Sequence, residues 1–500
     1  MKSPVLKSAR NHEAPLTSQA EAERDIGARV STNAGAILVG RGLAIGFSLA
    51  AGIVLARYLG SEKLGLFSSI YAYLALFNWL ATFGFEPILI REISKERGSA
   101  GSLIHTTVVM SCFLCAGTFL TALLLAPLAG YNGPLRLLLM LAALEFIVIP
   151  IRIPGVIFQI DMRQWYGSLI NVVRQTIWLG FVVFLSVEKL SLPYVILARL
   201  VCAVVEAALI WSYSERLVST EKHYIRERAR TLLIQAFPIA FTSFVATIYL
   251  RIDQVMLHKM ASDVVLGHYS AAVKVSELFE LFPAALMSSV APVLAVIATR
   301  PAEFKKYIDT SFRAFMVLGA FLCVCMTLGA DTIVRLFYGI QFIAAAPLLT
   351  ILIWSEMAVF FATVVLNAMV ARNLQKLLPW PTVVGAALNI TLNIVLIPRY
   401  SAVGAAWATL ISYTVAWMFF LLLFRSTRAL VFQGLRYAIP TTAVALFSIG
   451  VVARVRMPIS ARSLVSVTVF LCGMFATRMI SASDISEVHA LFAQAWRRVS

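Results

Sequence analysis

Basic side chains occur where charge is costly, inside long apolar segments of the sequence. Arg41 and Arg174 each lie deep within such a segment, and a charge near the centre of a bilayer costs roughly 2.5–3.5 kcal/mol. Arginine and lysine in such places face a partner or a hydrated cavity, where they donate charge-assisted hydrogen bonds to phosphate or carboxylate groups. We therefore expect a site for an anionic ligand, with four candidate contacts: Arg41, Arg174, Lys274 and Arg251.

Two acidic residues of these segments are candidates to carry a coupled ion. Glu277 follows Lys274 at i+3, so the two side chains share part of one helix face. Asp253 has no basic residue four positions away on either side, although Arg251 is close in the chain. Because a carboxyl group inside a membrane binds either a proton or a cation, Asp253 and Glu277 are the predicted ion-coupling candidates.

The other charges inside the segments are interpreted as structural. Glu145 and Arg152 share one helix face, and Arg199 and Glu206 share another. These two sets are expected to neutralise each other. Two further arginines lie near the ends of their segments: Arg313 and Arg335.

The elements that position these side chains are predicted to be membrane-spanning helices. The chain of 500 residues is 60% hydrophobic and only 13% charged, whereas soluble domains carry about 25% charged residues. A helix needs about 20 apolar residues to cross a bilayer. An all-α polytopic membrane protein with about fourteen spans is therefore predicted, at 31–56, 65–90, 102–128, 135–158, 166–187, 191–213, 231–255, 269–297, 312–336, 343–370, 379–397, 402–424, 436–453 and 461–480.

Lysine and arginine gather in the loops on one side of this arrangement, which predicts that both termini are cytoplasmic. The net charge of +17 is spread over many short loops, so topology explains it and a nucleic-acid partner is not expected. The predicted organisation is a cytoplasmic tail over 1–29, a six-helix N-lobe over 30–213, a basic cytoplasmic linker over 214–230, a six-helix C-lobe over 231–425, an extra helix pair over 436–480, and a cytoplasmic tail over 481–500.

A repeated segment supports two related lobes. Residues 55–73 and 257–275, at an offset of 202, share a leucine at each end of the external turn, a glycine and a serine. Each copy joins one long apolar run to the next. Such internal repeats are typical of secondary transporters, whose site lies between two related halves. The identical pairs are Leu55/Leu257, Leu64/Leu266, Gly65/Gly267 and Ser68/Ser270.

Several function classes are disfavoured. The six cysteines all lie inside apolar runs, where free cysteine behaves as a small buried hydrophobe, so neither a metal site nor a disulfide framework is expected. No loop is long enough to hold a soluble catalytic domain, and no hydrolase, nucleotide-binding or dinucleotide-binding motif occurs in a fitting context. The chain is predicted not to be an enzyme and to need no cofactor.

Two stretches resemble a known family. Residues 389–412, NITLNIVLIPRYSAVGAAWATLIS, and residues 251–277, RIDQVMLHKMASDVVLGHYSAAVKVSE, are similar to segments of the polysaccharide flippases in the multidrug/oligosaccharidyl-lipid/polysaccharide (MOP) exporter superfamily. The hydropathy resemblance covers roughly residues 30–480. The peptidoglycan-lipid flippases of the superfamily are a less close match, because their Arg-Asp pattern is replaced here by Arg91-Glu92 at best.

The resemblance implies two six-helix bundles around a cavity that opens alternately to each side. The implied cargo is an undecaprenyl-diphosphate-linked oligosaccharide, flipped from the cytoplasmic to the periplasmic leaflet of the bacterial inner membrane for surface or exopolysaccharide biosynthesis. Implied partners are membrane lipids and a polysaccharide polymerase or assembly protein. Two alternatives stay open at this point: a drug or metabolite cation antiporter of the same superfamily, and a non-transporting scaffold of a glycan assembly complex.

Overall fold

The computed structural model describes residues 16–218, 223–453 and 459–479, with side chains for residues 39–218, 223–452 and 462–479. Every regular element within these ranges is helical. The prediction of an all-α membrane protein is confirmed, since ten of these helices are long and apolar enough to cross a membrane, or eleven if one bent pair counts as a single span. The count of fourteen stays a prediction.

The elements up to residue 215 correspond to the first six predicted spans. They are α1 (Leu16–Thr82), α2 (Phe85–Lys95), η1 (Arg97–Ser99), α3 (Ala100–Leu125), η2 (Ala126–Ala129), α4 (Pro134–Ala143), α5 (Glu145–Arg152), η3 (Ile153–Val156), α6 (Ile157–Ile160), α7 (Gln164–Val187) and α8 (Leu192–Glu215).

The remaining elements begin at Arg226, within the predicted linker. They are α9 (Arg226–Met260), α10 (Asp263–Ser276), η4 (Glu277–Glu280), α11 (Leu281–Ile297), α12 (Pro301–Tyr338), η5 (Ile340–Ala345), α13 (Ala346–Leu352), α14 (Ser355–Ala371), η6 (Gln375–Leu377), α15 (Pro379–Thr414), η7 (Val415–Phe419), η8 (Phe420–Leu423), α16 (Arg425–Ala453) and α17 (Ile459–Ala476).

Two long elements each contain a break that divides them into two helices. In α1 the break is Gly60, with φ 70° and ψ 178°, a conformation that favours glycine because a Cβ would be strained there. In α15 the break is Ser401, with φ 53° and ψ −134°. Each break falls between two predicted spans. Each of these elements therefore contains two predicted helices that are joined at the break.

The polar N-terminal region differs from the loose tail that was predicted over 1–29. Helix α1 already begins at Leu16, because the stretch from there to the first apolar run is rich in alanine, glutamate and arginine, which are strong helix formers. Residues 1–15 and the predicted tail over 481–500 lie outside the described residues.

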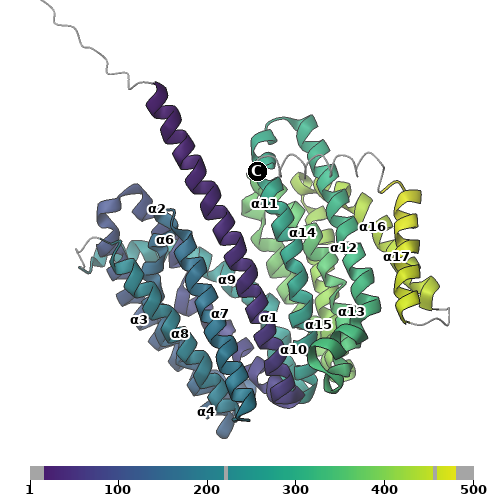
Figure 1. The fold of residues 1–500 in the computed structure, drawn as a ribbon, viewed down its shortest axis with the longest axis horizontal. Coiled ribbons are helices and arrows are strands. Elements are labelled where there is room, and N and C mark those ends of the chain that lie inside the picture. The colour runs from purple at the N-terminus through teal and green to yellow at the C-terminus, as the bar shows by residue number, and fades with distance from the viewer. Residues whose placement is uncertain (1–15, 219–222, 454–458, 480–500) are drawn as a thin grey trace, which may run out of the picture.

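Helices before and after the linker gather on opposite sides of the view in Figure 1, with α2–α8 in one group and α10–α17 in the other. Helix α1 runs between the groups and packs against α7, α9 and α10. Helix α9 also joins them. Its first part packs Leu232 and Ala236 with Phe85 of α2 and Leu103 of α3, whereas the ring of Tyr249, further along, packs at a tilt against that of Tyr413 beyond the break of α15.

The two ends of the bundle are named here by their landmarks. The repeat end contains the turn at Gly60 and the turn between α9 and α10, where the repeated segment lies. The loop end contains α2, η1 and the start of α9. The positive charge of the linker next to α9 makes the loop end the predicted cytoplasmic end.

Candidate functional site

Two adjoining cavities lie between the helices of the first half and those of the second. Each has a volume of about 390 Å³, which is within the range of ligand sites. They share Ser48, Arg251, Lys274 and Glu277 in their walls, so they form one continuous space. We call the two parts the charged chamber and the aromatic chamber.

The charged chamber brings together three of the four predicted anion contacts. Arg41 of α1, Arg251 of α9 and Lys274 of α10 all line it, together with two carboxylates of η4, Glu277 and Glu280. Amide side chains of α7 complete the polar wall. They are Asn171 and Gln175.

The three cations of this chamber differ in how they are paired. Glu277 forms ion pairs with both neighbours, with Oε1 at 2.9 Å from Nη1 of Arg251 and Oε2 at 3.7 Å from Nζ of Lys274. Arg41 is exposed and has no ion-pair partner among the described residues. The chamber therefore holds a bridged triad, Arg251–Glu277–Lys274, and one cation with free donors.

Aromatic and hydroxyl groups line the other chamber. Phe67, Tyr71, Trp178 and Tyr338 contribute rings, and Ser48, Ser68, Ser270 and Gln254 contribute polar atoms. The two serines of the repeated segment, Ser68 and Ser270, thus face one space from opposite halves. The buried Oγ of Ser270 has no hydrogen-bond partner among the described residues.

Arg199 also lines the aromatic chamber, but its charge is already neutralised. Its guanidinium lies 3.8 Å from the centre of the Tyr71 ring, and its Nε lies 3.1 Å from Oε1 of Glu145. The Tyr71 hydroxyl donates to the same carboxylate oxygen at 3.0 Å. Arg199 therefore ties α8 to α1 and α5.

Arg174 lies outside the walls of both chambers. Its Nε is 3.3 Å from Oε1 of Glu206, and its Nη2 donates to Oδ1 of Asn171 at 3.2 Å. Glu206 also pairs with Arg152 at 2.7 Å. The expected neutralisation of the two charge sets therefore takes place across helices, Arg152 with Glu206 and Arg199 with Glu145, and it includes Arg174.

The two ion-coupling candidates have different surroundings. Glu277 lines both chambers. Asp253 is buried and lines neither; its carboxylate accepts from the Tyr269 hydroxyl and from the backbone amide of Gln254, the latter at 2.7 Å. The Tyr269 hydroxyl lies 3.3 Å from Oγ1 of Thr409, so Asp253 is linked to α15 and not to the central cavity.

Sequence reasoning missed Glu280 and the aromatic wall. Glu280 follows Glu277 by three residues, and this spacing was a signal that it could share the same face. The aromatic residues gave no signal, because apolar rings are common in any membrane helix. Within the described residues no group of histidine, cysteine or acidic side chains is arranged to hold a metal ion.

The repeat end closes the space by backbone contact between the two copies of the repeated segment. A Cβ added at Gly65 would overlap the carbonyl of Asp263 and stand 2.8 Å from the amide nitrogen of Gly267. A Cβ at Gly267 would overlap the carbonyl of Ser61. Since Ser61 and Asp263 are related by the same offset of 202 as the two glycines, the contact is reciprocal.

Two cations at the repeat end also make reciprocal contacts between the two halves. Arg57 donates to the carbonyl oxygens of Leu336 and Phe337 at the end of α12, the latter at 2.8 Å. Lys259, its counterpart in the second copy, donates to the carbonyl of Leu128 in η2 at 2.9 Å. Each half thus caps helical carbonyls of the other.

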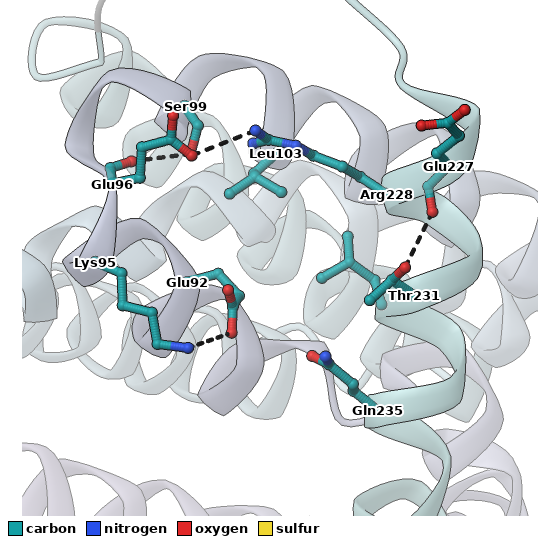
Figure 2. A pocket seen from close by; sticks show the side chains of 10 residues that line it. Glu92, Lys95, Glu96, Ser99, Leu103, Glu227, Arg228, Thr231 and Gln235 are labelled. Atoms are coloured by element: carbon teal, nitrogen blue, oxygen red, sulfur yellow. Dashed lines mark hydrogen bonds and ion pairs between the residues drawn. The ribbon is translucent and has the colours of Figure 1, made fainter.

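The loop end is held by the apolar packing of α9 on α2 and α3 and by exposed side-chain pairs around it. Arg228 of α9 lies 3.3 Å from Glu96, and Arg91 of α2 donates to Gln235 of α9 at 2.6 Å. Figure 2 shows the pocket of about 470 Å³ at this end, with Glu92, Lys95 and Glu96 on one side and residues of α9 on the other.

Comparison with known proteins places these features in a family. The family model described as "Polysaccharide biosynthesis protein" matches residues 30–298, and the MatE model matches residues 238–395. The "Probable low-salt glycan biosynthesis flippase Agl15" of Haloferax volcanii is 23% identical over 367 residues, which cover 72% of this chain and 76% of that protein.

Solved structures share the fold at low sequence identity. The lipid II flippase MurJ in an inward closed conformation has a TM-score of 0.69 at 14% identity, covering 88% of this chain and 98% of its own. An inward-facing MATE-family multidrug resistance transporter of the MOP superfamily has a TM-score of 0.61 at 13% identity, covering 81% and 98%. The family model spans more than half of the chain, and the resemblance to polysaccharide flippases seen in the sequence is confirmed: the chain belongs to the family described as "Polysaccharide biosynthesis protein" and shares the fold of MOP-superfamily transporters.

Proposed function

We propose that this protein flips a lipid-linked oligosaccharide, carried on undecaprenyl diphosphate, from the cytoplasmic to the periplasmic leaflet of a bacterial inner membrane. The observation that carries the proposal is the charged chamber, where Arg41, Arg251 and Lys274 converge from three helices of both halves. The flippase Agl15 and the family match support a glycan-linked cargo.

The charges of the chamber fit a diphosphate. Three cations face two carboxylates, Glu277 and Glu280, so the wall has a small positive excess. Arginine presents planar paired donors that suit phosphate oxygens, and Arg41 has its donors free of ion pairs within the described residues. Arg174 enters the proposal only indirectly, because it holds Asn171 in the chamber wall through a hydrogen bond.

The two ends of the bundle differ in how firmly they are closed, and this favours entry from the loop end. At the repeat end the two halves meet backbone to backbone at Gly65 and Gly267. At the loop end the contact is between side chains: Leu232 and Ala236 of α9 pack on α2 and α3. Exposed pairs such as Arg228 with Glu96 surround this packing and contribute only about 0–1 kcal/mol each. Side chains can repack as the halves separate, whereas the glycine contact holds two backbones together, so the loop end, proposed to be cytoplasmic together with both termini, is the proposed entry side.

Export is favoured by the membrane potential. Moving one charge across 100 mV is worth about 2.3 kcal/mol, so a dianion leaving a negative cytoplasm gains about twice that. A coupled ion is then needed only to return the empty carrier. Asp253 and Glu277 are the proposed carriers, and Glu277 is the better placed of the two because it faces the cavity.

The alternatives fit the site less well. A cation antiporter needs a net acidic cavity, whereas the charged chamber has more cations than carboxylates. A scaffold needs no polar cavity between its halves. A polysaccharide polymerase or another assembly protein remains a proposed partner of the flippase.

The proposal is tested in cells that depend on this protein for a surface glycan. Arg41→Ala, at normal protein level, is expected to leave the lipid-linked oligosaccharide on the cytoplasmic side and to abolish surface glycan. Lys306→Ala is the matched control, because Lys306 is an exposed lysine outside the cavity walls. Normal surface glycan in the Arg41→Ala strain would refute the cationic cavity.

A further inference from the structure

Glu277 occupies the place where an anionic ligand of the charged chamber has to bind. Its two carboxylate oxygens are divided between two cations on different helices, Arg251 of α9 at 2.9 Å and Lys274 of α10 at 3.7 Å. The side chain is half-buried and faces both chambers. A phosphate group approaching these cations therefore meets a carboxylate that already holds them.

A carboxylate and a phosphate compete for the same donors. A carboxylate presents a planar pair of acceptor oxygens and a phosphate presents a tetrahedral set. Both take charge-assisted hydrogen bonds from guanidinium and ammonium groups. The phosphate carries more charge and more oxygens than the carboxylate, so it displaces it once desolvated in the chamber. Arg41, which has no ion pair among the described residues, is free to make the first contact.

We propose that Glu277 is an internal substitute for the ligand phosphate, which the cargo displaces on binding and which recaptures Arg251 and Lys274 when the cargo leaves. This inference rests on the proposed function and specifies how its site recognises the phosphate. Exchange keeps Arg251 and Lys274 paired in both the empty and the loaded cavity. It gives the carrier a means to release a ligand that three cations would otherwise hold tightly.

The nearby Glu280 is a control that distinguishes this exchange from a general effect of negative charge in the chamber. It lines the same chamber on the same short helix, η4, but makes no ion pair among the described residues. Neutralising either glutamate removes one negative charge from the chamber. Only the loss of Glu277 also frees two cations.

The test is binding of a sugar-free isoprenyl diphosphate, farnesyl diphosphate, to the purified full-length protein in detergent. Glu277→Gln is expected to lower the dissociation constant about tenfold, the factor expected if the cations are free in about one-tenth of wild-type molecules. Glu280→Gln is expected to change it by less than about threefold, since it removes only a screened background charge. Equal gains in both variants, or no gain in Glu277→Gln, would overturn the exchange.

Two further variants extend the test, and Glu277→Asp keeps it decisive if Glu277→Gln is poorly folded. Glu277→Asp keeps the charge but shortens the side chain by one methylene, so it cannot span both cations and is expected to give an intermediate gain in affinity. Arg251→Gln combined with Glu277→Gln is expected to lose the gain, because one freed cation is gone. An unchanged affinity in Glu277→Asp, or a full gain in the double variant, would contradict the proposal.

The outcomes also distinguish this inference from the proposed function. If the wild type binds farnesyl diphosphate and Arg41→Ala weakens that binding, the anion site stands, and a missing gain in Glu277→Gln refutes the exchange alone. If the wild type does not bind the diphosphate, both proposals fail. We also expect farnesyl diphosphate to dissociate faster from the wild type than from Glu277→Gln when the complex is diluted.

Discussion

Gly65 and Asp263 belong to different halves of the chain, yet they are packed so closely that a Cβ on Gly65 would stand 2.7 Å from the carbonyl carbon of Asp263. The same relationship holds between Gly267 and Ser61. The repeated segment is therefore a pair of surfaces that close on each other, and each copy needs a glycine where the partner's backbone passes.

Adding a methyl group at these glycines is expected to hold the repeat end apart. Gly65→Ala or Gly267→Ala should destabilise the closed arrangement by about 1–3 kcal/mol, because overpacking of a close contact has that cost. Reduced thermal stability in detergent and reduced glycan export would report it. Gly180→Ala is the control, since a Cβ there meets nothing within 4 Å. Wild-type stability and export in both glycine variants would contradict the interpretation of this contact.

The exchanged cations at the repeat end are expected to act as latches. In the wild type, Arg57 and Lys259 each donate a charge-assisted hydrogen bond to a helical carbonyl of the other half. Removing either side chain is expected to cost about 1 kcal/mol. This corresponds to about a fivefold increase in the population of molecules open at this end.

Labelling of a cysteine at Ser270 by a membrane-impermeant thiol reagent, in a variant lacking the native cysteines, measures this population. Arg57→Ala and Lys259→Ala should each raise the labelling rate from outside, and the two together should raise it further. Lys63→Ala, which removes an exposed cation that lies beside the turn, should not. Unchanged labelling in the double variant would show that these contacts do not control access.

The exposed ion pair at the loop end is expected to contribute little to stability, although the loop end has to open for export. Glu96→Gln or Arg228→Gln should change stability by less than about 1 kcal/mol, because both side chains are solvent-exposed. In contrast, cysteines at these two positions joined by a short bifunctional thiol reagent should stop export, and only when both are present. Normal export after complete cross-linking would mean that the cargo does not enter at this end.

The paired arginines are expected to matter for stability more than for ligand binding. Arg199→Gln leaves Glu145 without its guanidinium partner, and the loss should cost about 1–3 kcal/mol. The double change Arg199→Gln with Glu145→Gln should recover part of the stability. Thermal unfolding measures the cost, and farnesyl diphosphate binding should be nearly unchanged in molecules that remain folded. The opposite pattern, intact stability with lost binding, would place Arg199 among the ligand contacts.

The sequence was sufficient for the helical membrane fold and for several of the charged residues that line the charged chamber. Arg251, Lys274 and Glu277 were found because charges in apolar segments are conspicuous, and Arg41 because it lies deep in one. The hairpin turn at Gly60 was also expected, since the repeat placed a boundary there.

What could not be predicted depends on the packing between helices. Arg174 looked as available as Arg41, but the structure turns it towards Glu206 of a neighbouring helix. Periodicity places two side chains on one face of a helix and says nothing of which other helix covers that face. The role of Gly65 and Gly267 was hidden for the same reason: the repeat was visible, but not that its two copies touch.

The central claim is tested most directly by reconstituting the purified protein in liposomes with an undecaprenyl-diphosphate-linked oligosaccharide in both leaflets, an inside-negative potential, and a membrane-impermeant glycosidase outside. The account predicts that the wild type moves the protected inner pool to the outer leaflet within the assay, and that folded Arg41→Ala does so at the rate of protein-free liposomes. An inner pool that stays protected with wild-type protein, or is exposed equally fast by Arg41→Ala, would contradict it.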